Sequence, residues 1–117
     1  MARLATTSDA FNAVAEPQRR LILSLLAHGE RPVNYIAGSL RFKQPQVSKH
    51  LRVLREVGLV RVRGAGQQRL YKLNGKGLKP IYDWAKTFES FWTESFDRLD
   101  DYLNKLQNKE KSHGHKK

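Results

Sequence analysis

Residues 44–63 have the sequence QPQVSKHLRVLREVGLVRVR, in which two different apolar periods follow each other. A helix is predicted from about Pro45 to Val57, because apolar residues recur there at the spacing of one helix face. These residues are Val47, Leu51 and Leu54. Gly58 is typical of the position just beyond a helix end, and LVRVR alternates with the period of a strand. The stretch therefore predicts a basic helix that leads directly into a β-strand.

The segments around this stretch extend the pattern in both directions. GAGQQ has turn chemistry and RLYKL alternates again, which predicts a β-hairpin. Three helices are predicted upstream: a short one capped by Ser8, one that begins at Pro17 and stops at Gly29, and one over residues 33–40. A long final helix is predicted over residues 78–106. This order predicts a mainly α fold with a small β-hairpin, the winged helix-turn-helix, with a long C-terminal dimerisation helix.

The apolar residues of these elements define the expected core. The first helix would bury Phe11, Val14 and Ala15, the second Leu21, Ile22, Leu25 and Leu26, and the third Val33, Ile36, Ala37 and Leu40. In the hairpin, Tyr71 and Leu73 are expected to pack inward.

The final helix carries more large apolar residues than one small core can cover. At 1.5 Å per residue it would span roughly 42 Å. We expect a second copy of the chain to cover it, because large aromatic rings dominate interface burial. The expected dimer interface is Phe11, Trp84, Phe88, Phe91, Trp92, Phe96, Leu99 and Leu103. A pocket for an apolar effector among these aromatic residues is the alternative.

The charge of the chain is concentrated in its middle. The 117 residues carry a net charge of +11, and residues 31–79 hold twelve Lys and Arg against a single acid, Glu56. Such a balance favours a polyanionic partner, with nucleic acid ahead of an anionic membrane surface. The length fits one domain. We expect a flexible N-terminus over residues 1–7, the DNA-binding and dimerisation domain over 8–107, and a disordered basic tail over 108–117.

Several classes of function are excluded or disfavoured by composition. The chain has no cysteine, which excludes disulfides and thiolate metal sites. His28 and His50 lie on different predicted helices, and His113 and His115 lie in the tail, so no regulatory metal site is expected. No cofactor, no nucleophile–base pair and no phosphate-binding glycine loop is apparent, and an enzyme is not expected. The absence of a long apolar run and of a signal peptide predicts a cytoplasmic protein without membrane association.

Three blocks of sequence resemble the ArsR family of bacterial repressors, in the branch that lacks the metal-binding cysteines. EPQRRLILSLL is similar to the opening helix of that family, QPQVSKHLRVLREVGLV to its recognition helix and GQQRLYKLN to its wing strand. The resemblance covers roughly residues 9–103. Where metal-sensing members carry a Cys-Val-Cys box, this chain has Pro32, Val33 and Asn34. The resemblance implies a winged-helix repressor that does not respond to metal through cysteines.

The polar residues of the recognition helix and the wing are the candidate DNA contacts. In a helix-turn-helix the N-terminal part of the recognition helix enters the major groove, where amide and hydroxyl side chains contact base edges. Basic side chains more often hold phosphates. The candidates are Gln44, Gln46, Ser48, Lys49, His50, Arg52 and Arg55 in the helix, and Arg63, Gln67, Gln68 and Arg69 in the wing. His50 lies beside the apolar stripe, so a half-buried, hydrogen-bonded histidine is the alternative there.

The predicted function is a homodimeric, sequence-specific transcriptional regulator that represses by occupying a palindromic operator of double-stranded DNA. A non-specific architectural nucleic-acid binder and a protein–protein adaptor are alternatives, as is a small-molecule-responsive repressor. The sequence identifies no effector.

Overall fold

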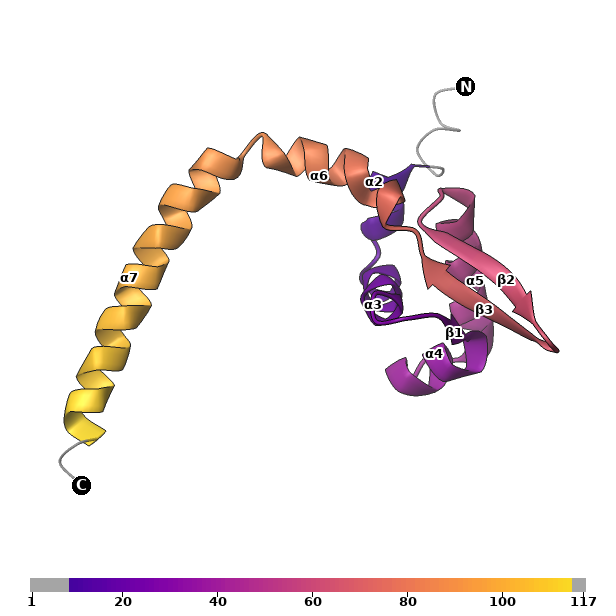
Figure 1. Ribbon diagram of the computed structural model, residues 1–117, viewed down its shortest axis with the longest axis horizontal. Helices are drawn as coiled ribbons and strands as arrows, with labels where there is room; N and C mark the ends of the chain where they lie inside the picture. Colours follow the sequence, from indigo (N-terminus) through magenta and orange to yellow (C-terminus); the bar gives the residue numbers. More distant parts are fainter. Residues whose placement is uncertain (1–8, 115–117) are drawn as a thin grey trace. The chain divides into compact units, whose positions relative to one another are not determined.

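The structure is a computed structural model that describes the backbone of residues 9–114 and the side chains of residues 9–108 (Figure 1). The N-terminal elements are α2 (Ala10–Val14), α3 (Pro17–Leu26), β1 (Arg31–Pro32), α4 (Val33–Leu40) and α5 (Gln44–Glu56). They are followed by β2 (Val60–Ala65), β3 (Gln68–Leu73), the 3₁₀ turn η1 (Gly75–Leu78), α6 (Lys79–Lys86) and α7 (Glu89–Gly114). The chain divides into two compact units, one ending at Tyr82 and the other beginning at Asp83.

The first unit has the winged helix-turn-helix architecture that the sequence predicts. Its core gathers apolar side chains from α2, α3, α4, α5 and the hairpin, and the residues that are at most 2% exposed are Ala13, Ile22, Leu26, Ile36, Val47, Leu51, Leu54 and Leu59. Val47, Leu51 and Leu54 are the three inward-facing positions predicted for α5. Their burial fixes which face of α5 points outward, since residues three and four apart share one side of a helix.

α5 ends in a Schellman motif, which joins the helix to the wing. The amide of Leu59 donates to the carbonyl of Leu54 at 2.8 Å, and the amide of Gly58 donates to that of Arg55 at 3.0 Å. Gly58 has φ of +82°, a left-handed conformation that favours glycine. The predicted helix end is therefore confirmed, and Leu59, fully buried, anchors the start of the hairpin.

The wing is part of a three-stranded antiparallel sheet of order β1-β3-β2. β2 pairs with β3 from Val60↔Leu73 to Ala65↔Gln68, so the hairpin turns at residues 66–67. β1, which the sequence did not predict, pairs with the other edge of β3 through Arg31↔Tyr71 and Pro32↔Leu70. Tyr71 is buried and Leu73 half-buried, as expected. The third strand ties the wing to the segment between α3 and α4.

The first two helices differ from the prediction in their details. The side chain of Asp9 caps α2 by accepting a 2.7 Å hydrogen bond from the amide of Asn12, whereas the predicted cap Ser8 lies outside the described residues. α2 buries Ala10 and Ala13, whereas Phe11 and Ala15, which were expected in the core, are exposed and Val14 is half-buried. In α3 it is Leu23 that is buried, and Leu21 is half exposed.

The prediction of one continuous final helix over residues 78–106 is wrong, because the structure has two helices there and the second extends further. The two are divided at residues 87–88, where the hydroxyl of Thr87 donates to the carbonyl of Trp84 at 2.7 Å. This bond satisfies a carbonyl at the end of α6, as threonine side chains commonly do. α7 then continues to Gly114, over residues 108–114 where disorder was expected, and its Lys and Glu residues there are good helix formers. Residues 1–7 and 115–117 lie outside the described residues.

No helix within the described range is both long enough and apolar enough to cross a membrane.

Candidate nucleic-acid interface

The outward face of α5 carries most of the polar residues that the sequence selects. Gln44, Ser48, Lys49, Arg52 and Arg55 are all exposed, while the opposite face is anchored in the core. Lys43 precedes the helix and is also exposed. An amide and a hydroxyl near the helix N-terminus, followed by three cations, are the donors and acceptors that base edges and phosphates require.

The wing tip lies close to the start of α5. Gln44 shares a groove of about 320 Å³ with Gln67, Gln68 and Arg69 of the wing. Pro32, Val33, Asn34 and Tyr71 line the rest of it. Four residues selected from two separate segments of sequence are therefore brought together on one surface.

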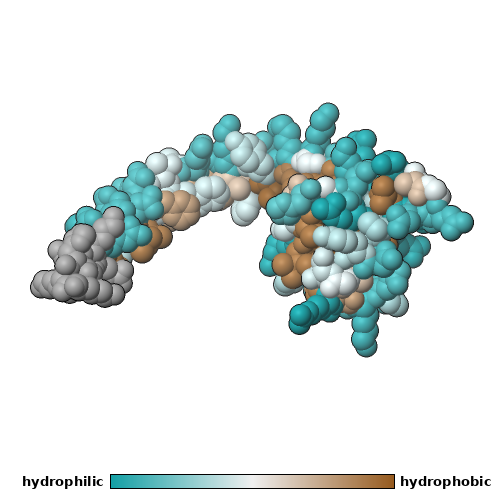
Figure 2. Space-filling view, turned by 60° about the horizontal axis from the view of Figure 1, so that its bottom comes forward, coloured by the Kyte–Doolittle hydropathy of each residue, from teal (hydrophilic) through white to brown (hydrophobic). Residues whose placement is uncertain are grey.

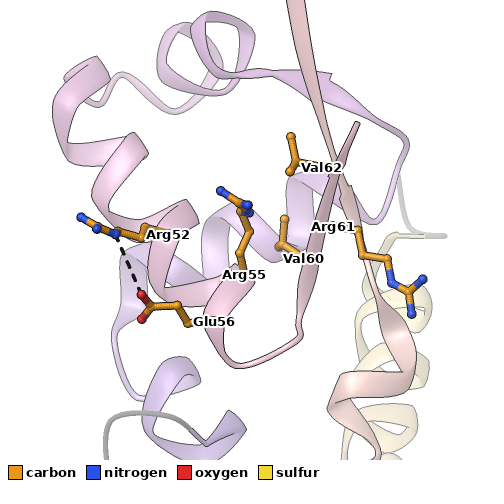
Figure 3. Close-up of a pocket in the computed structure, with 6 residues that line it drawn as sticks. All are labelled: Arg52, Arg55, Glu56, Val60, Arg61 and Val62. Atoms are coloured by element: carbon orange, nitrogen blue, oxygen red, sulfur yellow. Dashed lines mark ion pairs between the residues drawn. The ribbon is translucent and has the colours of Figure 1, made fainter. Parts of the chain in front are cut away.

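A second cleft, of about 620 Å³, lies between α5 and β2 (Figure 3). Arg52 and Arg55 border it from the helix, and Val60 and Val62 from the strand, while Arg61 points to the opposite side of β2 (Figure 3). Arg52 pairs with Glu56 across one helical turn at 3.9 Å, with both side chains largely exposed. An exposed pair at this distance contributes little stability and leaves Arg52 available to another anion.

Two of the predicted contacts point toward α3. Gln46 donates from Nε2 to Oε1 of Gln18 at 2.5 Å, and Nε2 of His50 lies 2.9 Å from the same oxygen. Both side chains are half-buried. His50 thus has the hydrogen-bonded environment that was the alternative for this position, and its contact with DNA remains a prediction.

The environment of His50 also changes its titration. Partial burial lowers the pKa of His50 below its ordinary value of 6.5, the positive charge of Arg19 lowers it further, and Glu16 opposes the shift. The shift favours the uncharged ring at neutral pH, and the oxygen of Gln18 accepts a hydrogen bond from the tautomer that carries its proton on Nε2.

Arg63, selected as a wing contact, is held by an acid from outside the hairpin. Its Nε donates to Oε2 of Glu30 and its Nη2 donates to Oε1, both at 2.9 Å. The hydrogen bond to Arg63 lowers the pKa of Glu30 below its ordinary value of 4.5, against the opposing effect of desolvation. The same contact raises the pKa of Arg63.

Comparison with known proteins gives this arrangement a family. The family model for bacterial regulatory proteins of the arsR family matches residues 16–62, from α3 into the wing. An HTH-type transcriptional regulator of Mycobacterium tuberculosis, Rv2034, is 38% identical over 86 residues, 74% of this chain and 78% of that protein. The chain belongs to the ArsR family.

Two further similar proteins extend the comparison. The transcriptional repressor SdpR of Bacillus subtilis is 31% identical over 69% of this chain and 90% of its own length. The homodimeric winged helix-turn-helix DNA-binding domain Mb0332 of Mycobacterium bovis, solved in solution, superimposes with a TM-score of 0.60 at 29% identity. That match covers 76% of this chain and 82% of the domain. These relatives are regulators and not enzymes, which confirms that expectation.

The structure adds residues to the interface that the sequence did not select. Asn34 lines the groove at the wing tip, and Gln18 and Glu30 hold side chains of α5 and of the wing. Gln18 lies 32 residues before His50, and Glu30 lies 33 residues before Arg63. No local pattern connects residues so far apart, so only the fold reveals these partners.

The second unit of this ArsR-family chain exposes a row of large apolar side chains. Trp84 and Phe88 meet edge to face with ring centroids 5.4 Å apart, and Phe88 lies 6.4 Å from Trp92. Of the predicted interface residues, those in this unit are between 36% and 66% exposed: Trp84, Phe88, Phe91, Trp92, Phe96, Leu99 and Leu103. Phe11, which is 43% exposed, belongs to the first unit. Apolar side chains are visible between hydrophilic ones along this helical segment (Figure 2). Exposed apolar area of this extent marks an interaction surface.

Across the described part of the chain, no group of three or more His, Cys, Asp or Glu side chains is arranged to hold a metal ion.

Proposed function

We propose that this chain is a homodimeric, sequence-specific DNA-binding regulator that represses transcription by occupying a palindromic operator. The observation that carries the proposal is the outward face of α5. Its polar side chains are aimed away from a core that fixes Val47, Leu51 and Leu54, and Gln44 at the start of the helix shares one groove with the wing tip. Such a helix and wing match the docking geometry of winged helix-turn-helix proteins. The proposed place of action is the cytoplasm.

The residues divide by the chemistry of their side chains. Gln44 and Ser48, near the N-terminus of α5, would contact base edges. Lys49, Arg52 and Arg55 would hold phosphates, and so would Arg69 and Arg63 in the wing. Gln67 and Gln68 at the hairpin tip would contact the adjacent groove of the DNA.

Gln46 and His50 have a different relation to DNA, because both are hydrogen-bonded to Gln18. We propose that they contact DNA while this bond is retained. The bond limits the rotamers of both side chains, so less side-chain entropy is lost on binding.

The dimer is proposed from the second unit. α7 has 26 residues, and the large aromatic and leucine side chains described along it are exposed. A second copy would bury them, since burial of apolar area drives association. The related domain from Mycobacterium bovis is described as a homodimer, which supports this assembly. Two recognition helices would then reach successive major grooves about 34 Å apart.

The proposal is tested by the salt dependence of duplex binding. If the dimer neutralises about six to ten phosphates, affinity should fall by roughly 10³–10⁵ between 50 and 200 mM salt. Fluorescence anisotropy with a labelled duplex measures this directly. An affinity that barely responds to salt would contradict the proposal.

Competition with random duplex separates a specific repressor from an architectural binder. The net charge of +11 would give either protein some affinity for any duplex. A specific repressor should prefer its operator by at least about 10³-fold. Equal competition by random duplex would instead indicate the architectural class.

A further inference from the structure

The pairing of Arg63 with Glu30 uses only one edge of the guanidinium. Nε and Nη2 each donate to one carboxylate oxygen at 2.9 Å, which is a side-on, bidentate arrangement. An arginine side chain has five N–H donors in a rigid plane. The pairing occupies two of them and leaves the three that point away from Nε. The Arg63 side chain is 60% exposed, whereas that of Glu30 is 27% exposed, so the open edge faces solvent.

The sheet explains how an acid before β1 reaches the wing. Pro32 pairs with Leu70 on one edge of β3, and Leu70 pairs with Arg63 on the other, so these three residues form one row across the sheet. Glu30 lies two residues before Pro32, and its side chain crosses toward β2. Glu30, Arg63 and Leu70 line the same shallow pocket on this side of the hairpin, which confirms that they meet there.

The backbone at Glu30 is also constrained. Gly29 has φ of +145°, a region that residues with a Cβ rarely adopt, and a Cβ there would lie 3.1 Å from Nη1 of Arg31. That same Nη1 donates to the carbonyl of Glu30 at 2.8 Å. The carboxylate is therefore presented from a fixed segment, while Arg63 lies on a hairpin near its free end.

We propose that Glu30 is a positioning residue for DNA binding: it holds the guanidinium of Arg63 so that its outer edge meets a DNA phosphate. The inference rests on the proposed function and assigns a role to an acid that contacts no DNA itself. A guanidinium fixed before binding loses less conformational freedom when it forms its bonds to a phosphate. Glu30 would orient the arginine much as an outer carboxylate orients a metal-binding histidine.

Simple electrostatics predicts the opposite effect of removing this acid. A carboxylate near a phosphate backbone repels it, so a neutral residue at position 30 should strengthen binding to any duplex. Two further cations, Arg61 and Lys72, lie directly opposite each other on adjacent strands and line the same pocket as Glu30. Neutralising Glu30 would leave their positive charges without this nearby acid, which also favours tighter binding to DNA. The two explanations therefore predict opposite changes in DNA affinity when Glu30 is neutralised: weaker binding if Glu30 positions Arg63, and tighter binding if only its charge matters.

The test compares Glu30→Gln with a charge-matched control, Glu56→Gln. Glu56 lies at the end of α5 and pairs with Arg52 at the long distance of 3.9 Å. The probe is a duplex that the wild-type protein selects from a random library, measured beside a random-sequence duplex. Glu30→Gln should bind the selected duplex roughly two- to tenfold more weakly, whereas Glu56→Gln should bind it at least as tightly as the wild type.

A second variant separates positioning from a loss of folding. Arg63→Lys keeps the positive charge but cannot form the bidentate pair, so its affinity for the selected duplex should fall by a similar factor. Because both substitutions break one contact, Glu30→Gln should add no further loss in the Arg63→Lys background. If Glu30→Gln melts well below the wild type, the comparison of Arg63→Lys with the wild type carries the test instead.

The outcomes distinguish failure of the inference from failure of the proposed function. Tighter or unchanged binding by Glu30→Gln, or by Arg63→Lys, overturns the positioning role while specific binding by the wild type stands. Independent, additive losses in the double variant also overturn it. If the wild type selects no duplex at all, the proposed function and the inference fall together.

Discussion

Nε2 of His50 lies 2.9 Å from Oε1 of Gln18, and this contact links the recognition helix α5 to α3. Gln46 donates to the same oxygen at 2.5 Å. One amide oxygen of α3 therefore organises two side chains that lie one turn apart on α5. The stability of the domain and the geometry of its proposed DNA contacts both depend on this oxygen.

Replacing Gln18 with leucine removes the shared acceptor at nearly constant volume. The amide of Gln46 and the ring of His50 would each lose a partner, and a hydrogen bond of this kind contributes about 0.5–1.5 kcal/mol. We expect the free energy of unfolding to fall by about 1–2 kcal/mol, measured by urea denaturation. Gln44→Leu is the control, because Gln44 is exposed and the change should stay within about 0.5 kcal/mol. Equal effects of the two substitutions would contradict the role of Gln18.

The lowered pKa of His50 predicts a pH dependence of stability. Because burial and Arg19 lower the pKa of His50 in the folded state, the unfolded chain binds more protons below pH 6.5. The contribution of the neutral His50 ring to the free energy of unfolding is therefore fully present above pH 6.5. It is lost as the pH falls through the lower pKa of the folded state. The loss should be at most about 1 kcal/mol, since solvent screens a half-buried ring.

Thermal melting at several pH values measures this contribution. His50→Gln keeps a hydrogen-bond donor but does not titrate. The stability advantage of the wild type over this variant should therefore narrow or reverse as the pH falls below 6.5. A difference that stays constant between about pH 5 and pH 8 would show that His50 titrates alike in both states.

Lys49 and Arg52 are expected to act through phosphates. Substituting either residue with alanine should weaken binding to all duplexes by a similar factor and reduce the slope of log affinity against log salt by about one. Lys105→Ala provides the control, because Lys105 is an exposed cation in α7, outside the winged domain. A loss confined to one DNA sequence would instead assign Lys49 or Arg52 to base contacts.

Trp92 is the residue of choice for testing the dimer. Trp92→Arg places a charge in the middle of the exposed apolar row, and a buried unpaired charge is costly. We expect the sedimentation mass to fall from twice 13.5 kDa to a single chain at micromolar concentration. Asp97→Arg, which adds the same side chain at an exposed acidic position of α7, should remain dimeric.

Dimer loss should leave the winged domain folded, because the core residues described in it all belong to the first unit. Circular dichroism of Trp92→Arg should therefore keep most of the helical signal. A wild-type mass close to one chain would contradict the proposed dimer.

The parts of the fold that follow local periods were predictable. Val47, Leu51 and Leu54 repeat at helical spacing, and the core buries all three. α4 has the predicted bounds, and the alternation of the wing gives the observed hairpin. Each of these signals lies within a few residues of the element that it specifies.

The contacts that the sequence did not predict join distant segments or interrupt a continuous period. β1 has two residues, too few to show a period, and it exists because β3 offers it a free edge. The apolar spacing of Trp84, Phe88 and Trp92 continues across the break between α6 and α7, so only the hydroxyl of Thr87 marks the division. Glu30 and Arg63 meet because β3 pairs with β1, just after Glu30, on one edge and with β2, which holds Arg63, on the other. No local pattern encodes this pairing.

The most direct test of the central claim is selection of bound sites from a random duplex library by the wild-type chain. A homodimeric repressor should enrich one palindromic motif, with half-sites about 10–10.5 base pairs apart or a multiple of that distance. A selection that enriches no motif, or one half-site without its symmetric copy, would contradict the account.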